Sequence, residues 1–455
     1  MASIDAERLQ KLAANFSGSL LRPGDGEYEE ARRVHNGLID KRPALIARCR
    51  GTADIIEALA FAREGGLEIS VRGGGHSVAG RAVTDGGVTI DLSQMRAIHV
   101  DPGARTVRAQ GGVTWGELND ATAAHGLATT GGVVSTTGIA GLTLGGGYGW
   151  LMGKYGLAVD NLVSAELVTA AGDVLTANAD EHPDLFWALR GGGGNFGVAA
   201  SLEYRLNPLQ QVVGGLVAHP FPAAKEALRF FREFTETVPD ELTAAAGLVH
   251  APDGSGMALS AFIVCHAGSS EQANADLKPL LEFGSPAMVQ VGPMPYPAVN
   301  TLLDEAYPRG ALNYWKSSFL ADLGNEAIEA MVGTFAACPS PMGAVVLEHW
   351  HGAATRVGVS DTAVPHRKPG FNFLVTSVWM DPATTDPNVA WARETNAAVE
   401  PHFVHRRYVN YLDADDAGDV RGAYGPNYAR LAEVKRTYDP DNLFHLNQNI
   451  QPAAA

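Results

Sequence analysis

A histidine beside three glycines is the most chemically suggestive feature of this sequence. The run extends from Val71 to Ser77, places Gly73, Gly74 and Gly75 directly before His76, and follows a predicted strand. Because successive glycines carry no Cβ atoms, their backbone N–H groups can form a concave nest close to a pyrophosphate. The neighbouring imidazole is a nucleophile. The run therefore predicts an anion-binding loop that carries a reactive histidine.

A second glycine-rich run extends from Gly138 to Gly149 and contains three consecutive glycines of its own. It has the same freedom to bring backbone close to a ligand. Two such loops and one histidine indicate a large cofactor that bears phosphate.

A third glycine-rich segment, Gly192 to Gly197, contains the G-x-G-x-x-G pattern of nicotinamide dinucleotide sites. A true site of that kind follows a strand and opens a helix. Here the helical pattern of Asp184 to Leu189 precedes the glycines, and the strand-like Val198 to Tyr204 follows them. Because this order is reversed, the segment argues against a nicotinamide cofactor.

The composition limits the class of protein. A formal net charge of −16 would repel a phosphate backbone, so nucleic acid is not expected as a partner. Apolar stretches end well short of the roughly 20 residues that a membrane span needs, and the first residues do not read as a signal peptide. We expect a cytoplasmic protein without membrane contact, either a monomer or a homo-oligomer. Cys49, Cys265 and Cys338 lack disulfide or zinc spacing, and no metal site is predicted.

Apolar periodicity predicts two parts in the chain. Up to about residue 208, strands and helices alternate, and a predicted strand, helix and strand at residues 45–49, 54–63 and 67–71 deliver the His76 loop.

From about residue 209 onward, helical segments are interspersed with segments that alternate with period two. This pattern is typical of an antiparallel sheet backed by helices, so the expected fold class is α+β. A Pro-rich loop is also expected at residues 291–297. The helices are expected at 224–237 and 270–283, and the strands at 257–264, 344–347 and 371–379.

Five motifs together resemble the berberine-bridge-enzyme-like branch of the vanillyl-alcohol-oxidase flavoprotein superfamily. They are Arg72 to Gly80, Gly138 to Gly149, Lys154 to Leu157, Tyr408 to Tyr411 and Tyr438 to Phe444. The resemblance covers nearly the whole chain, and five motifs in this order and spacing are hard to obtain by chance. It implies a two-lobed, PCMH-type FAD-binding domain formed by residues 1–208 with 428–455, and a substrate-binding domain at 209–427.

The resemblance also implies how FAD is held. In this family the histidine of the first loop bonds covalently to the 8-methyl carbon of FAD, and His76 occupies that place. Many relatives attach the flavin a second time through a cysteine, but here Val134 stands at that position, so a single link is expected. The other residues implied in cofactor binding are Arg72, Gly73, Gly74, Gly75, Ser77, Gly80, Thr137, Gly138, Gly141, Leu142, Gly145, Gly147, Val198 and Asn410.

Tyr411 is the residue that the resemblance favours as the catalytic base. In several family members a tyrosine of this motif, with its hydroxyl pKa lowered by neighbours, removes the substrate proton. Tyr155 would support it with a second hydroxyl. The alternative interpretation is that Tyr408 and Tyr411 are packed side chains whose hydroxyls are satisfied by hydrogen bonds.

Two departures from the family pattern affect the choice of base. Relatives often carry Glu or Gln where this chain has Thr376, which weakens a glutamate-base mechanism. His351 stands where relatives usually have glycine, and a histidine with a pKa near neutrality could take the proton instead. His349 and His351 could also form a metal pair, although a third clustered ligand is missing.

The predicted reaction is the oxidation of a small organic substrate. A C–H bond next to oxygen or nitrogen would lose hydride to the flavin while the base takes the O–H or N–H proton, and O2 would reoxidise the flavin to give hydrogen peroxide. Alcohols, sugars, amines and polyketide-type compounds all stay open as substrates. A dehydrogenase with another electron acceptor and a flavin-binding protein without catalysis also stay open.

Overall fold

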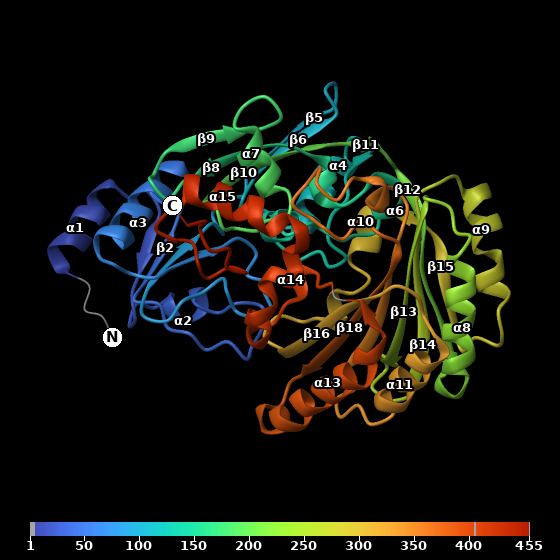
Figure 1. Ribbon diagram of the computed structural model, residues 1–455. Helices are drawn as coiled ribbons and strands as arrows, with labels where there is room; N and C mark the ends of the chain where they lie inside the picture. Colours follow the sequence, from blue (N-terminus) through green and yellow to red (C-terminus); the bar gives the residue numbers. More distant parts are fainter. Residues whose placement is uncertain (1–4, 405, 455) are drawn as a thin grey trace.

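The computed structural model describes residues 5–404 and 406–454, and it shows an α+β protein with two sheet-rich parts (Figure 1). The first part, blue to green in Figure 1, contains two larger sheets, and the second, light green to orange, contains one broad sheet.

The first sheet has the strand order β1-β2-β4-β3, with β2, β4 and β3 parallel and β1 antiparallel to β2. Helix α3 (Thr52–Glu64) connects β2 to β3 and buries Ile55 and Leu59 in the core beside the sheet. The predicted strand, helix and strand are thereby confirmed within a few residues. β3 ends at Arg72, where the His76 loop begins. The strands are β1 (Ser19–Leu21), β2 (Leu45–Arg48), β3 (Ile69–Arg72) and β4 (Val88–Asp91).

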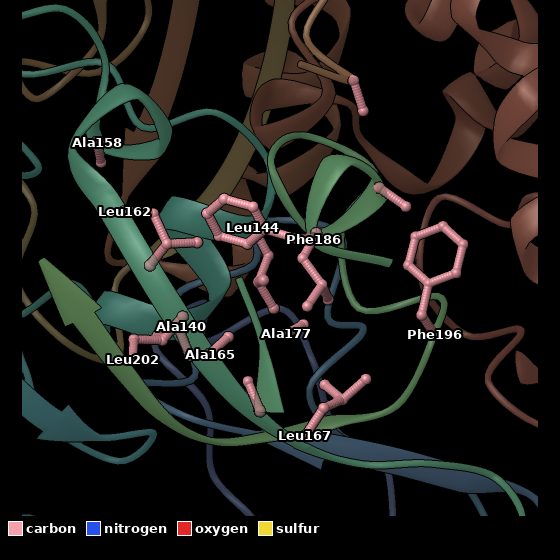
Figure 2. Close-up of a cluster of buried hydrophobic side chains, with 14 of the residues drawn as sticks. Ala140, Leu144, Ala158, Leu162, Ala165, Leu167, Ala177, Phe186, Phe196 and Leu202 are labelled. Carbon is pink, nitrogen blue, oxygen red and sulfur yellow. The ribbon is translucent and has the colours of Figure 1, made fainter. Parts of the chain in front are cut away.

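The second sheet is antiparallel, with the order β5-β6-β10-β8-β9. Figure 2 shows its apolar core, where Leu144 of α5 and Phe186 of α7 lie beside Leu162 of β8. Helix α7 precedes Gly192 and β10 follows Gly197, which confirms the order that argued against a nicotinamide site. The elements are β5 (Ile98–Asp101), β6 (Thr106–Gln110), α4 (Trp115–Ala123), α5 (Ile139–Leu144), β8 (Leu162–Val168), β9 (Val174–Ala177), α7 (Pro183–Leu189) and β10 (Val198–Arg205).

The broad sheet is antiparallel throughout, with the order β15-β12-β14-β13-β17-β18-β16-β19. Helices α8, α9, α11 and α13 cover one face, as expected for a sheet backed by helices (Figure 1). Its strands are β12 (Gln211–Pro220), β13 (Leu242–His250), β14 (Ala258–His266), β15 (Met288–Pro295), β16 (Leu312–Leu320), β17 (Ala344–Trp350), β18 (Gly370–Trp379) and β19 (Phe403–Val404), and the helices are α8 (Ala224–Thr235), α9 (Ser270–Glu282), α11 (Asn325–Phe335) and α13 (Thr385–Val399).

The predicted Pro-rich loop at residues 291–297 is wrong, because the chain there finishes β15 and begins α10 (Tyr296–Asn300). β15 lies at the edge of the sheet and pairs only with β12 among the described strands. An edge strand tolerates proline, since an N–H that faces outward has no ladder bond to lose.

The last helix, α15 (Tyr428–Tyr438), packs against α7 and returns the chain to the first part (Figure 1). Its buried Lys435 donates hydrogen bonds to the carbonyl oxygen of Asn195 and to the carboxylate of Asp439. The apolar core that α15 joins in the first part also includes Val409 and Tyr424, which precede residue 428 in the sequence. The proposed domain boundary at residue 428 therefore stays a prediction, and the packing favours an earlier one.

A buried ion pair joins segments that are far apart in sequence. Arg367 donates to both carboxylate oxygens of Asp160, each at 2.8 Å. Within residues 5–404 and 406–454, no helix has the length and apolar character needed to cross a membrane.

Candidate active site

A cavity of about 910 Å³ lies between the glycine-rich loops and the face of the broad sheet that the helices leave uncovered. One end is formed by the His76 loop, the run after Gly132, and Gly193, Gly194 and Gly197. The other end is formed by side chains of β12, β13, β14 and β17. This volume is near the upper end of about 300–1,000 Å³ for small-molecule and cofactor sites. The cavity therefore combines a glycine-rich end with an apolar end.

The first two glycine loops touch through their backbones inside this cavity. A Cβ atom on Gly74 would come within 2.4 Å of the Gly138 nitrogen, and one on Gly138 would come within 2.3 Å of the Gly74 nitrogen. No side chain fits at either place unless the loops separate. The loops thus present a backbone surface of the kind that a cofactor pyrophosphate requires.

Gly138→Ala is expected to yield protein without bound FAD, because the added methyl group separates the two loops. The ratio of flavin to protein absorbance in the purified protein measures this. Gly333→Ala is the matched control, since Gly333 is exposed on α11 and no atom outside its own helix lies within 4 Å of an added Cβ. A full flavin content in Gly138→Ala would contradict the predicted contact.

His76 lines the cavity, as expected of a residue that reaches the cofactor. Its Nε2 lies 2.8 Å from the Thr136 hydroxyl, and its ring stacks on His35 with centroids 3.8 Å apart. Burial, and secondly His35, lower the pKa of His76 to about 3. The imidazole is therefore neutral near pH 7 and keeps a free electron pair for bond formation.

Most of the other residues implied in cofactor binding also reach the cavity. Asn410 does so from the C-terminal segment, and its Nδ2 donates to the Leu142 carbonyl oxygen at 2.9 Å. The residues that line the cavity are Gly73, Gly74, Gly75, Ser77, Val134, Thr137, Gly138, Gly141, Leu142, Gly145 and Asn410.

Four of the residues implied in cofactor binding lie outside the cavity lining. The Arg72 guanidinium turns away and donates to the Ala31 carbonyl oxygen. Gly80, with φ +66°, packs against the Ile39 side chain. The Gly147 N–H donates to the Tyr408 hydroxyl. These three residues shape the loops.

Val198 is the fourth, and its side chain is 0% exposed within the apolar core of the first part. Its neighbours Gly197 and Ala199 reach the cavity instead.

Val409–Tyr411 form a 3-10 turn, and Tyr408 directly precedes it. The Tyr408 hydroxyl accepts hydrogen bonds from the N–H groups of Gly147 and Tyr148 at 2.8 and 3.0 Å, and from Asn410 Nδ2 at 3.0 Å. Tyr408 is therefore the packed, satisfied tyrosine of the alternative interpretation. The turn leaves Tyr411 facing the cavity.

Tyr411 donates its hydroxyl hydrogen to Glu348 Oε1 at 2.8 Å. Burial and the neighbouring Glu348 raise the pKa of Tyr411 well above its ordinary value. The predicted lowering of this pKa is thus in the wrong direction. Tyr411 is protonated at neutral pH and acts as a hydrogen-bond donor to the carboxylate.

Glu348 is the acid that the sequence interpretation did not assign. It lies on β17, lines the cavity and is only 4% exposed. Its carboxylate accepts from Tyr411 and from Asn372 Nδ2, the latter at 2.7 Å. Burial raises the pKa of Glu348 to about 7, although both hydrogen bonds oppose the shift. A carboxyl group with this pKa can accept and release a proton near neutrality.

The strand pattern could have revealed Glu348. Ala344, Val346 and Glu348 alternate along β17 and all three line the cavity. Their neighbours point to the other face. An acid at an alternating position of an otherwise apolar strand is therefore the available sequence signal.

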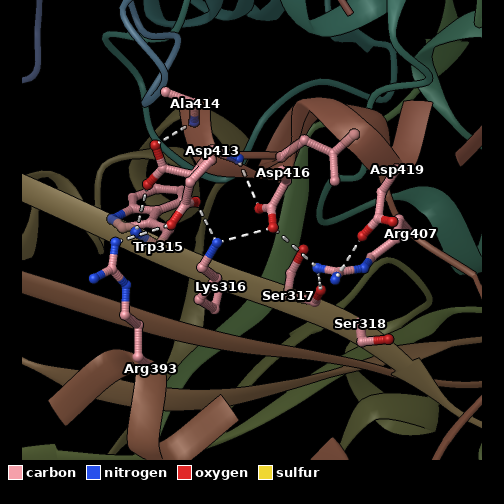
Figure 3. A network of polar contacts seen from close by, with 12 residues as sticks. Trp315, Lys316, Ser317, Ser318, Arg393, Arg407, Asp413, Ala414, Asp416 and Asp419 are labelled. Atoms are coloured by element: carbon pink, nitrogen blue, oxygen red, sulfur yellow. Dashed lines mark hydrogen bonds and ion pairs between the residues drawn. The ribbon is translucent and has the colours of Figure 1, made fainter. Parts of the chain in front are cut away.

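An ionic network fixes the segment that carries Tyr411 to β16 (Figure 3). The Trp315 N–H donates to Asp413 at 3.2 Å, and Lys316 Nζ donates to Asp416 at 2.8 Å. Arg407 pairs with Asp419 at 2.9 Å. Because these contacts flank Tyr411 on both sides, they position its hydroxyl toward Glu348.

Tyr155 and His351 do not line the cavity, so their predicted catalytic roles gain no support from their positions. Tyr155 is half-buried beside the apolar cluster of Trp150 and Leu209. His351 stacks on His349 with centroids 4.3 Å apart, and burial lowers the pKa of both rings. In the described part of the chain, no group of three or more metal-ligating side chains is found.

The residues present fit FAD. Besides the two adjoining glycine loops, five residues in the cavity wall have buried polar atoms without a hydrogen-bond partner among the described residues. They are Arg81 Nε, the Tyr148 hydroxyl, Trp150 Nε1, His250 Nδ1 and Gln448 Oε1. A large polar cofactor can satisfy such groups, whereas leaving them unpaired costs about 1–3 kcal/mol each.

Comparison with known proteins identifies a flavoprotein oxidoreductase. The profile described as "FAD binding domain" matches residues 43–178, and the profile "Berberine and berberine like" matches residues 407–451. The chain is 33% identical to (R)-6-hydroxynicotine oxidase of Paenarthrobacter nicotinovorans, over 97% of this chain and 99% of that protein. It is 28% identical to an FAD-linked oxidoreductase of Dictyostelium discoideum, over 98% and 97% of the two chains.

Solved structures agree with these relatives. The fold matches that of 6-hydroxy-D-nicotine oxidase from Arthrobacter nicotinovorans with a TM-score of 0.88 and 32% identity, covering 96% of this chain and 98% of that one. A BBE-like protein of Physcomitrella patens matches with a TM-score of 0.89 and 22% identity, covering 98% and 100%, which shows the shared fold. The chain belongs to the berberine-bridge-enzyme-like family of FAD-linked oxidoreductases.

Proposed function

We propose that the protein is an oxidase with FAD bound covalently through His76, and that Glu348 is the base. The substrate would be a small organic molecule that carries a C–H bond next to oxygen or nitrogen. The position of Glu348 carries the proposal, because it places a carboxyl group with a pKa of about 7 in the same cavity as the glycine loops. The oxidoreductases among the relatives support the reaction class.

Each residue has a defined task in this proposal. The Glu348 carboxylate takes the O–H or N–H proton of the substrate. Tyr411 and Asn372 donate to its two oxygens and so fix its orientation. A ring nitrogen of His76 would hold FAD through a bond to its 8-methyl carbon. This bond would replace one C–H bond of the methyl group and leave the flavin reduced by two electrons, which O2 would then accept. Val134, which lines the cavity, leaves this as the single link.

FAD supplies the two-electron acceptor for the substrate's hydride. The substrate loses one hydride and one proton and becomes a carbonyl compound or an imine. O2 finally takes two electrons and two protons and leaves as hydrogen peroxide.

An anaerobic screen of alcohols, sugars and amines for flavin bleaching tests this function. At least one compound should bleach the flavin, and under air each mole of product should yield one mole of peroxide. Bleaching without peroxide under air would indicate a dehydrogenase with another acceptor. A flavin that no compound reduces would indicate a binding protein.

The rate of flavin reduction is expected to rise with pH and to reach a plateau above an apparent pKa near 7. The sign follows from the role of Glu348, since a base acts in its deprotonated form. The groups that act electrostatically with Glu348 are the hydroxyls of Tyr148, Tyr307, Tyr408 and Tyr411, whose pKa values are all raised. Anaerobic stopped-flow measurements between about pH 5 and 9 check this, and a rate that falls with pH would contradict it.

A further inference from the structure

Glu348 has no positive partner in the described part of the chain. Among the described residues, no Lys, Arg or His nitrogen lies within salt-bridge distance of its carboxylate, although many other acids in the chain have such pairs. Arg81 lines the same cavity, but its Nη1 donates to the carbonyl oxygens of Leu446 and Asn447 near the C-terminus.

The histidines of the cavity do not supply the missing charge either. Burial lowers the pKa of His35 to about 4 and that of His76 to about 3, and it also lowers the pKa of His250. All three are therefore uncharged near pH 7. A buried carboxylate without a counter-charge is costly, so a ligand that brings a positive charge is favoured there.

Three aromatic side chains form a wall of the cavity beside this carboxylate. Tyr307 and Trp315 meet with ring centroids 5.6 Å apart, and Trp315 and Tyr411 meet at 5.8 Å, both in T-shaped arrangements. The row ends at Glu348, because the Tyr411 hydroxyl is bonded to it. Aromatic rings attract cations through their negative faces, most strongly where water is excluded.

Small residues form a hollow in the sheet next to Glu348. Ala245 lies directly opposite Glu348 on the neighbouring strand, and Gly247 lies opposite Val346. Further along the same row, Ala261 pairs with Gly247, and Ala218 pairs with Ala261. The hollow has room, since a Cβ on Gly247 would meet only Val249 Cγ1 at 3.4 Å and the Val345 oxygen at 3.7 Å.

The same surface offers little to a sugar. A sugar ring needs several donors and acceptors around it, because each hydroxyl left unpaired in a dry site costs free energy. Among the described residues of β12, β13 and β14 that line the cavity, His250 at the end of β13 is the one polar side chain. The others are Leu216, Ala218, Ala245, Ala246, Gly247, Val249, Leu259, Ala261 and Ile263. These residues suit an apolar ring or chain.

We infer that the substrate is an apolar amine that binds as a cation, with its nitrogen between Glu348 and the aromatic wall and its ring or chain in the small-residue hollow. This inference rests on the proposed function and selects amines from the substrates that it leaves open. The protein's net charge of −16 favours the approach of such a cation.

The chemistry of the bound amine balances. The ammonium gives its N–H proton to the Glu348 carboxylate and becomes a neutral amine with a free electron pair. Loss of hydride from the adjacent carbon then oxidises the amine by two electrons to an iminium ion, while FAD, the resident acceptor of this family, is reduced by two electrons. Water can later hydrolyse the released iminium ion to an amine and a carbonyl compound.

Binding of a matched pair of unreactive ligands tests the charge. Phenyltrimethylammonium and its neutral carbon isostere, tert-butylbenzene, have the same shape, and neither can yield an imine. At pH 8, the FAD-loaded protein should bind the cation at least about 10-fold more tightly by titration of the flavin absorbance, which corresponds to about 1.4 kcal/mol. In Glu348→Gln the preference should disappear. Equal binding in the wild type, or an unchanged preference in the variant, would overturn the inference.

A second pair of variants tests the hollow. Gly247→Leu should weaken binding of both ligands by about 10-fold or more, because the new side chain occupies the apolar space. Gly333→Leu makes the same change on the exposed surface of α11 and should bind both ligands like the wild type. Unchanged binding in Gly247→Leu would show that the ligands do not use the hollow.

Oxidisable substrates separate this inference from the proposed function. N-methylbenzylamine should reduce the flavin anaerobically in preference to benzyl alcohol. If alcohols reduce it through Glu348 and amines do not, the inference fails and the proposed function stands. If neither amines, alcohols nor sugars reduce it, both fail.

Discussion

In Glu348→Gln, substrate is expected to reduce the flavin at least about 10²-fold more slowly than in the wild type. This is the usual scale for a lost general base. The amide cannot accept the substrate proton, while its size is nearly that of the carboxyl group. FAD content should not change, since Glu348 lies on the broad sheet and not in the glycine loops. Anaerobic stopped-flow absorbance at the flavin band measures the rate, and the acid-precipitated pellet measures the flavin content.

Tyr411→Phe is the graded control for this variant. It removes one of the two hydrogen-bond donors to the Glu348 carboxylate and leaves Asn372 in place. Because the base is then less well oriented, the rate of flavin reduction is expected to fall by about 10-fold. The opposite order is also informative. If Tyr411→Phe stalls and Glu348→Gln reacts at the wild-type rate, Tyr411 is the proton acceptor.

The stability of Glu348→Gln shows whether a slow variant is merely misfolded. The folded state raises the pKa of Glu348 from 4.5 to about 7, so folded protein binds this proton more tightly than unfolded protein does. The contribution of protonated Glu348 to the free energy of unfolding is therefore lost as pH rises from about 4.5 to 7. The loss is on the order of 3 kcal/mol. Glutamine does not ionise, so the variant should gain unfolding temperature relative to the wild type at pH 8 and not at pH 4.

The glycine loops and His76 were predictable from sequence because their function depends on local chemistry. Contact between Gly74 and Gly138 leaves no space for a Cβ atom. Only glycine meets this requirement, so it is visible in the sequence. The elements around them were predictable for a similar reason. Short apolar strands and the amphipathic α3 have periods that the sequence displays.

Alternation along β17 could have singled out Glu348 as an acid in an otherwise apolar strand, but its place in the cavity depends on strand register. The sequence directs attention to Thr376, where relatives often have Glu or Gln. In the sheet, Thr376 lies opposite Ala344, and Glu348 lies opposite Asn372 four residues away. Nothing local to either strand specifies this pairing. Only the assembled sheet shows that a neighbouring strand supplies a carboxylate to the cavity.

The pKa of Tyr411 was predicted in the wrong direction for a different reason. The resemblance gives no information about the tertiary contacts that hold Val409–Tyr411 as a 3-10 turn. The Tyr408 hydroxyl is fixed by two backbone N–H groups of the second glycine run, and the ionic network around Asp413 and Asp416 fixes the residues that follow. These contacts come from distant parts of the chain, so local pattern could not reveal them.

His76→Ala is expected to lose all covalently bound flavin. In the wild type, protein precipitated by acid should stay yellow and its intact mass should include FAD. In the variant the pellet should be colourless, because alanine lacks the imidazole that is proposed to bond with the 8-methyl carbon of FAD. Val134 provides no second link. FAD itself can still bind before acid treatment, since both glycine loops keep their contact at Gly74 and Gly138.

The matched control is His99→Ala, which removes an exposed histidine of β5. After acid precipitation, it should retain the same fraction of its flavin as the wild type. A loss of flavin in His76→Ala alone would then assign the covalent link to the His76 imidazole. The neutral state of His76 makes the assignment chemically reasonable, because burial keeps its pKa at about 3 and its electron pair free at the pH of the cell. Flavin released by acid from the wild type, or retained by His76→Ala, would show that FAD is held by contacts alone or through another residue.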